Sequence, residues 1–172
     1  MFLLFNKRNK EDKEYKKLIN KEKKYDELTK IVYNSSGDMN GNIDCHEFDI
    51  KNLEIITEYR QEMGEDIKET KYKITEDNIN TIKDYINKYN FPMWDNLEFD
   101  ENEFILDGPS TSIVFYYNNE KIDGRFFETY SINHNYKMPE MARKNLNEFE
   151  KYLFSLEIEE NIIKERYKKD ID

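Results

Sequence analysis

Short runs of alternating apolar and polar residues recur in the first half of this chain. They lie at residues 43–50, 53–60 and 70–74, and Lys51-Asn52 supplies a turn between the first two. A period of two predicts strands with one buried face, and the short turn predicts a hairpin. In the first run the apolar side changes between Cys45 and Phe48, which predicts a bulge or an edge strand.

A helix is predicted immediately after these runs. Thr75 has the type of side chain that caps a helix N-terminus, and acidic residues follow it in the first turn. Helical spacing then places four apolar side chains on one stripe, and Pro92 predicts the end of the helix. The stripe consists of Ile79, Ile82, Ile86 and Tyr89.

The second half repeats this order of strands followed by a helix. Residues 111–117 and 126–132 alternate on either side of a loop and predict a second hairpin. A last helix is predicted from Pro139, with its apolar spacing continuing through Ile158 and Ile162. Hairpins separated by helices predict an α+β fold, an antiparallel sheet built from two hairpin regions with helices packed on one face.

Residues 1–30 differ in composition from the rest of the chain. They hold ten Lys or Arg against six Asp or Glu, and apolar residues such as Tyr15 and Leu18 recur near helical spacing. This segment is predicted to be a basic N-terminal helix or to be partly disordered. A dense turn signal at residues 35–42 then marks the entrance to the folded part. The predicted organisation is therefore a segment at 1–30 and a single domain at 31–172.

The net charge of −10 restricts the partners that residues 31–172 can bind. An excess of negative charge repels phosphate backbones, so we expect no nucleic-acid binding through the main domain. It favours solubility and a basic protein partner. A homo-oligomer is left open. The residue bias toward Ile, Asn and Lys is typical of an AT-rich bacterial genome.

The first five residues form the longest apolar run. A membrane-spanning helix needs about 20 such residues and a secretory signal roughly 7–15, so we predict a cytoplasmic protein. Basic residues follow the run, which leaves two alternatives for residues 1–10. They are weak contact with an anionic membrane and docking of the apolar residues on their own domain or on a second subunit.

Three segments of the sequence resemble a group of uncharacterised proteins from low-GC bacteria. They are the turn at residues 36–41, the segment at 93–97 that follows the first predicted helix, and the segment at 106–112. The resemblance spans roughly residues 31–153. It implies a domain boundary near residue 31 and no particular activity.

The stretch from Asp38 to Asp49 has oxygen-bearing residues at positions 1, 3, 5 and 12 of a calcium-binding loop. Ile43 stands where that loop requires Gly, and Asp49 stands where a bidentate Glu is usual. We therefore predict a turn and no metal or cofactor site. Cys45 and His46 are neighbours on a predicted strand, so their side chains point to opposite faces and cannot form a nucleophile–base pair.

Two interpretations of function follow. The favoured one is a non-enzymatic protein-interaction domain, with immunity or antitoxin-like neutralisation of a basic partner as its narrower version. The alternative is an enzyme of unrecognised type with a site near Asp107, Glu128 and His134. Glu128 carries that alternative, because it shares a strand face with aromatic residues where burial would raise its pKa. Residues 110–112 offer hydroxyl groups, but no nucleophile elbow surrounds them.

Overall fold

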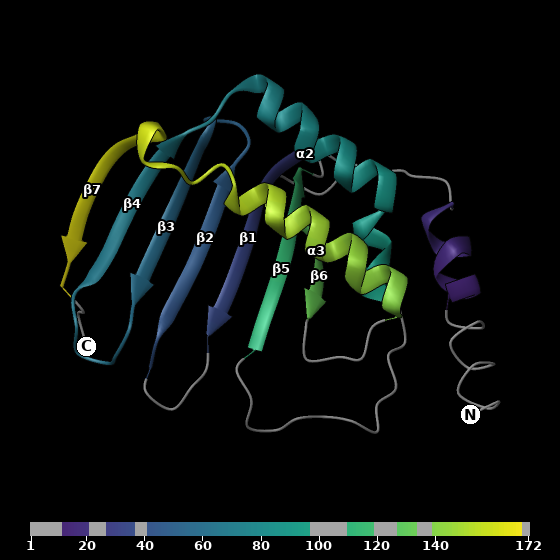
Figure 1. Ribbon diagram of the computed structural model, residues 1–172, viewed down its shortest axis with the longest axis horizontal. Coiled ribbons are helices and arrows are strands. Elements are labelled where there is room, and N and C mark those ends of the chain that lie inside the picture. Colours follow the sequence, from purple (N-terminus) through teal and green to yellow (C-terminus); the bar gives the residue numbers. More distant parts are fainter. Residues whose placement is uncertain are drawn as a thin grey trace.

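In the computed structural model, seven strands form one antiparallel sheet in the order β6-β5-β1-β2-β3-β4-β7. The structure describes residues 12–20, 27–36, 41–96, 110–118, 127–133 and 139–169. The strands are β1 (Leu28–Ser36), β2 (Ile43–Asp49), β3 (Glu54–Arg60), β4 (Ile67–Lys73), β5 (Ser110–Asn118), β6 (Phe127–Asn133) and β7 (Ile162–Lys168). Figure 1 shows β7 at one edge of the sheet and β5 and β6 toward the other.

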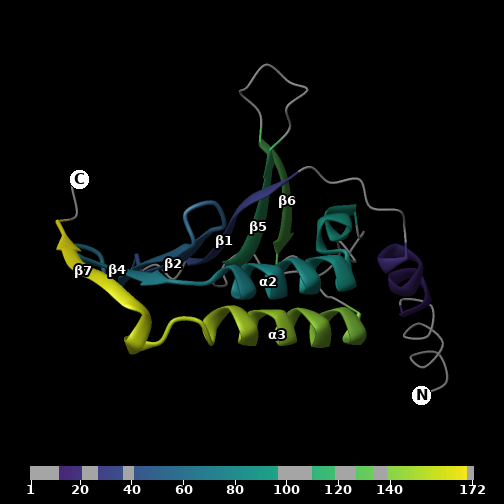
Figure 2. The same cartoon turned by 90° about the horizontal axis from the view of Figure 1, so that it is seen from above.

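Two helices cover one face of this sheet, α2 (Glu76–Tyr89) and α3 (Glu140–Phe154). Seen from above in Figure 2, both run along the same side, and the opposite face carries no helix among the described residues. The predicted α+β class is therefore confirmed, with helices on one face. A further helix occupies residues 12–19, and a short 3-10 helix η1 (Phe91–Asn96) follows α2.

The first predicted helix forms for the reasons seen in its sequence. The Thr75 side chain accepts a hydrogen bond from the backbone N–H of Asn78, and the Asn78 side chain accepts one from the backbone N–H of Thr75. This reciprocal pair satisfies two donors at the start of α2. The helix ends at Asn90, which adopts a left-handed conformation at φ 54°. All four stripe residues from Ile79 to Tyr89 are buried.

The core lies between the helices and the sheet. Its largest fully buried side chains come from every layer of the fold, with Trp94 from η1, Phe48 from β2, Phe115 from β5 and Phe149 from α3. Phe91 joins the layers, because its ring lies 4.8 Å from Trp94 and from Phe149 and stacks on Phe115 at 5.9 Å. Aromatic packing of this kind supplies the apolar area that the sequence, with one Ala, does not obtain from small residues.

The helix at residues 12–19 belongs to the same core. Tyr15 is fully buried, its ring lies edge-on 5.2 Å from Trp94, and its hydroxyl accepts a hydrogen bond from the Asn145 amide of α3. Leu18 is buried too, and its carbonyl accepts a bond from the Asn90 side chain. The predicted boundary between residues 30 and 31 falls inside β1, which begins at Leu28.

Three local expectations are wrong. The last helix ends at Phe154 and does not continue to Ile158 and Ile162, because Ile162 begins β7. Residues 28–36 form a strand, where the sequence had predicted the end of a helix and the start of a turn. Finally, β2 is neither bulged nor at an edge, since it pairs in continuous register with β1 and β3. Its apolar pattern is irregular because a histidine, His46, takes the position two residues before Phe48 on the helix-covered face.

Candidate functional site

His46 lies in β2 on the helix-covered face of the sheet. Its Nδ1 is 2.8 Å from Oε1 of Glu157, just beyond α3, and its Nε2 is 2.8 Å from Oδ1 of Asp44. The side chains of His46 and Glu157 are each 12 % exposed. The His46 ring also meets Tyr33 and Phe154 edge-on, at 5.6 and 5.0 Å between ring centres. We call these five residues the His46 cluster.

Two opposing effects act on the pKa of His46. Burial alone lowers it, but the hydrogen bond and charge of Glu157, together with Asp44, outweigh burial and raise the pKa. In the protonated imidazole both nitrogens are donors, and each then donates to one carboxylate. Neither nitrogen has a lone pair left to accept a proton or bind a metal. This geometry fits a structural role, in which His46 connects β2 to Glu157 in the segment that follows α3.

Cys45 points to the other face of β2, as its position next to His46 in a strand predicts. It is half-buried among carboxylates. Burial raises the pKa of its thiol, and Glu58 and Glu47 raise it further. A thiol in this environment stays protonated at neutral pH and is a poor nucleophile.

The described residues do not include the side chains of the predicted enzyme site. Asp107 and His134 lie outside the described residues. Glu128 lies in β6 opposite Tyr117 of β5, and its side chain is also outside what the structure describes. Residues 110–112 begin β5, where Ser112 pairs with Asn34 of β1.

The segment that resembles a calcium loop is only partly described. Asp38 and Asn40 lie outside the described residues. Asp49 is the last residue of β2, and its Oδ1 accepts hydrogen bonds from the backbone N–H groups of Lys51 and Asn52 in the turn that follows. Among the described residues, no group of three or more His, Cys, Asp or Glu side chains is placed to hold a metal ion.

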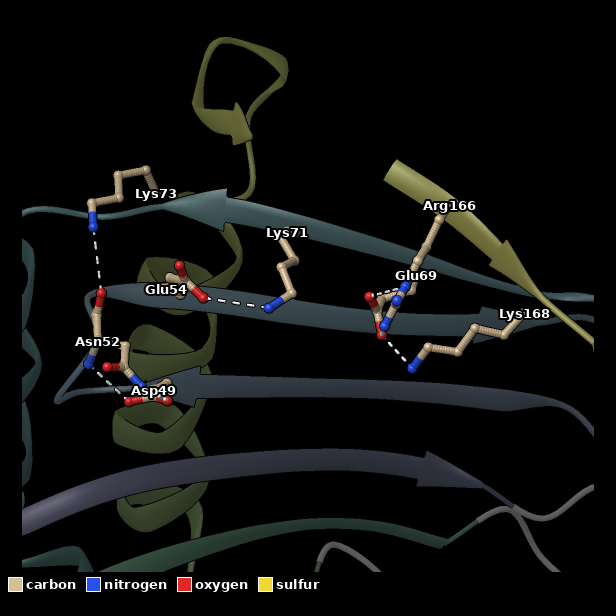
Figure 3. A network of polar contacts seen from close by, with 8 residues as sticks. All are labelled: Asp49, Asn52, Glu54, Glu69, Lys71, Lys73, Arg166 and Lys168. Atoms are coloured by element: carbon tan, nitrogen blue, oxygen red, sulfur yellow. Dashed lines mark hydrogen bonds and ion pairs between the residues drawn. The ribbon is translucent and has the colours of Figure 1, made fainter. Parts of the chain in front are cut away.

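A network of ion pairs occupies the face of the sheet that carries no helix (Figure 3). Arg166 of β7 donates two hydrogen bonds to Glu69 of β4, at 2.6 and 3.0 Å. Lys168 of β7 contacts Glu69 as well and bonds Glu58 of β3 at 2.7 Å. The Glu69 side chain is only 4 % exposed. Its pKa is lowered to about 2, first through the bond from Arg166 and then through Lys168.

Exposed apolar side chains gather around β7. Within this strand Ile162, Ile163 and Tyr167 are 36 %, 52 % and 65 % exposed, and Ile158, four residues before it, is 45 % exposed. Tyr59 of β3 is half exposed, and the register places it in one row across the sheet with Lys68 of β4 and Tyr167. We call the strand β7 with these apolar neighbours the β7 edge.

A second surface feature is less suited to binding. A shallow groove runs along the outer side of α3 and is lined by side chains of both charges, among them Glu140, Arg143 and Lys151. A small-molecule site needs an apolar lining with a few converging polar groups. The residues that line this groove are all polar or charged.

Sequence reasoning had not identified the β7 edge, because it assigned Ile158 and Ile162 to the buried side of a helix. Residues 163–168 show no clear alternation, because Ile163 and Tyr167 are four residues apart among charged residues, a spacing that fits a helix as well as a strand. Searches against protein-family models, curated proteins and solved structures found no match to this chain. Among the described residues, no helix is both long and apolar enough to cross a membrane.

Proposed function

We propose that this protein is a protein-interaction domain that binds its partner at the β7 edge. The observation that carries the proposal is the exposure of Ile162, Ile163 and Tyr167 on a strand that has no neighbour on its outer side among the described residues. An edge strand offers unpaired N–H and C=O groups, and apolar side chains beside them add contact area that excludes water.

The grouping of these residues supports the proposal more than the exposure of any one of them. Single exposed apolar side chains are common on protein surfaces, whereas several in one region mark interaction sites. Here three lie within β7, Ile158 lies four residues before it, and Tyr59 lies in one row with Lys68 and Tyr167. Tyrosine is also among the side chains that contribute most to binding energy at interfaces.

The charge of the chain supports a narrower version of this function. A net charge of −10 attracts a basic protein, as an immunity or antitoxin-like role requires. The same charge opposes binding to nucleic acid. The enzyme alternative with Asp107, Glu128 and His134 stays a prediction. A substrate screen tests it by comparing the unmodified protein with a variant in which these three side chains are replaced together.

Photo-crosslinking in cells of the organism that encodes the chain tests the interaction. A photoreactive phenylalanine analogue replaces Tyr167 in one variant and Met63 in another. Met63 is the matched control, because it is apolar and 71 % exposed but lies in the turn between β3 and β4. We expect a discrete protein adduct from position 167 and none from position 63.

Binding of the crosslinked partner to the purified protein then provides the quantitative test. Replacing Ile163→Asp together with Tyr167→Asp should weaken this binding at least tenfold, because a charge would be buried in the contact. Met63→Asp should leave it unchanged. Equal adducts from both positions, or equal affinities of the two variants, would contradict binding at the β7 edge.

A further inference from the structure

Strand β7 and its neighbour β4 together have a charge opposite to that of the whole chain. Strands β4 and β7, with the adjacent Lys169, hold seven basic and two acidic side chains, a balance of +5. The complete sequence has a balance of −10. A surface this different from the rest of its molecule favours a ligand of the opposite sign.

The two faces of β7 differ in chemistry. Lys164 and Arg166 share a face with Lys168, because strand residues two apart point the same way and Arg166 bonds Glu69 on the face without helices. Glu165 and Tyr167 point to the other side, where Glu165 pairs with Lys68 at 3.1 Å. A strand added to β7 would therefore meet three cations on one face and Tyr167 on the other.

The carboxylates within the fold do not neutralise all the cations of β7 and of the adjacent Lys169. Arg166 and Lys168 share Glu69, and Lys168 also reaches Glu58. Among the described residues, Lys164 and Lys169 have no ion-pair partner. Positive charge without a partner carboxylate therefore lies beside the outer backbone of β7. The side chains of an added strand would lie about 5 Å from these cations, which is the usual cross-strand separation.

From these observations we propose that the β7 edge binds an extended acidic segment of another protein, which adds to the sheet as an eighth strand. The segment would alternate acidic residues, facing Lys164, Arg166 and Lys168, with apolar residues on the side of Tyr167. This inference rests on the proposed interaction function. It gives the partner an acidic segment at the β7 edge, in place of the basic partner of the immunity or antitoxin-like version.

Two other occupants fit the same observations less well. A second copy pairing through its own β7 would bring a second set of cations against the first, which is unfavourable across a strand pair. A single-stranded nucleic acid would meet the basic strand, but its sugar–phosphate backbone has no peptide N–H and C=O groups that could pair with the outer side of β7. Neither ligand would both pair with the free backbone groups of β7 and match the chemical difference between its two faces.

The experiment is a titration of the isotope-labelled full chain with three seven-residue peptides, followed by amide NMR. One peptide alternates valine and glutamate, the second alternates valine and lysine, and the third repeats the acidic peptide with proline at its central position. We expect the first peptide to shift the β7 amides saturably. The second should not bind, and the proline peptide should bind at least tenfold more weakly, because proline cannot donate to a strand ladder.

A pair of charge-reversal variants supplies the control. Lys164→Glu with Lys169→Glu should weaken binding of the acidic peptide at least tenfold, whereas Lys144→Glu with Lys151→Glu, the same charge change on the outer side of α3, should not. Equal weakening by both pairs would show attraction to the whole molecule and overturn the site. The solution mass also shows whether the protein dimerises. A dimer that the acidic peptide dissociates would assign the edge to a second copy of the chain instead.

The remaining outcomes separate the failure of this inference from the failure of the proposed function. Tighter binding of the lysine peptide at β7 overturns the acidic partner and leaves the interaction site standing. Equal binding of the proline peptide overturns strand addition. Shifts of the β7 amides by a ten-residue oligouridine, without shifts by any peptide, would overturn the protein partner. No shift with any ligand overturns the inference, and the crosslinking experiment then decides the function separately.

Discussion

His46 joins two parts of the chain that are 111 residues apart in sequence. The ring sits between two aromatic side chains, and both of its nitrogens face carboxylates. A charged imidazole in this position stabilises the folded state, because hydrogen bonds to charged groups contribute about 1.5–3 kcal/mol. The groups that face His46 or its ring neighbours are Asp44 and Glu157, with Glu150 of α3 acting on Tyr33.

The pH dependence of stability follows from the direction of the pKa shift. Folding raises the pKa of His46 above its usual value of 6.5. Its contribution is therefore fully present below about pH 6.5 and is lost as pH rises through the raised pKa. We expect His46→Gln to lower the free energy of unfolding by about 1.5–3 kcal/mol at pH 6, with a smaller loss at pH 9. Urea unfolding at both pH values measures this.

The other histidine of the sequence provides the control. In the variant His134→Gln, any remaining histidine titration belongs to His46. The variant Glu157→Gln should reduce the pH dependence of stability, because it removes the partner that acts most strongly on His46. A loss on His46→Gln that is the same at pH 6 and pH 9 would show that the ring contributes packing alone.

Residue-level prediction from sequence succeeded where the information is local. The cap at Thr75 and the opposite directions of Cys45 and His46 follow from neighbours within a few positions, and both are confirmed. The bond from His46 to Glu157 could not be predicted. It depends on where α3 ends and on which strand its C-terminus meets.

At the scale of elements, sequence reasoning missed two strands for different reasons. In β1 the apolar residues Ile31, Val32 and Tyr33 are consecutive and do not alternate, and they lie between a highly charged segment and a dense turn signal. In β7 nearly every side chain is exposed, because helices cover neither of its faces. Strands are recognised by a buried face, so a strand held by backbone pairing and ion pairs gives a weak signal.

The attachment of β7 to β4 depends on Glu69. We expect Glu69→Gln to weaken this attachment, since Arg166 and Lys168 would lose the carboxylate they share. A loss of about 1.5–3 kcal/mol in local opening free energy corresponds to roughly 10- to 100-fold faster amide exchange in β7. Hydrogen exchange read by mass spectrometry measures it. Glu54→Gln, which removes a pair with Lys71 alone, is the matched control.

The same carboxylate sets an acid limit for this part of the fold. The pKa of Glu69 is lowered to about 2, so the stability that Glu69 contributes is present above its usual pKa of about 4.5 and is lost as pH falls toward 2. If β7 exchanged no faster in Glu69→Gln than in Glu54→Gln, the ion pairs would not be what holds the edge strand.

At the scale of the whole molecule, the helix at residues 12–19 and the sheet form one core. Tyr15 contacts Trp94 and Asn145, and the carbonyl of Leu18 satisfies the buried amide of Asn90. Burial raises the pKa of Tyr15 to about 12, despite the hydrogen bond from Asn145. These contacts come from the C-terminal end of α2, from η1 and from α3, which are all distant from residue 15 in sequence.

Truncation tests how far the N-terminal segment and the domain are one folding unit. Deleting residues 1–26 keeps β1 and removes Tyr15 and Leu18, whose burial contributes roughly 3–6 kcal/mol before the entropy of ordering the helix is subtracted. Deleting residues 1–11 is the matched control. We expect a lower urea midpoint for the longer deletion. Equal midpoints would show that residues 12–26 contribute nothing to the stability of the fold.

Prediction of the whole molecule from sequence was limited by contacts between residues that are far apart along the chain. The fold class could be derived because the hairpin regions and the helix α2 are local patterns. The strand order could not, because β1 pairs with β5 and β4 pairs with β7 across long stretches of chain. The β7 edge, which carries the proposed function, exists only once the last of these pairings has formed.

The strand order also has a consequence during synthesis. Strands β2, β3 and β4 pair with their neighbours in sequence, so they can assemble as soon as they leave the ribosome. Glu69 and Arg166, which join β4 to β7, are separated by 97 residues, and β7 is the last of the seven strands to be made. Until then β4 lacks the neighbour that covers it in the finished sheet, and an edge left open in this way is prone to mispairing. The nascent chain cannot present the β7 edge to a partner, so binding there must follow completion of the fold.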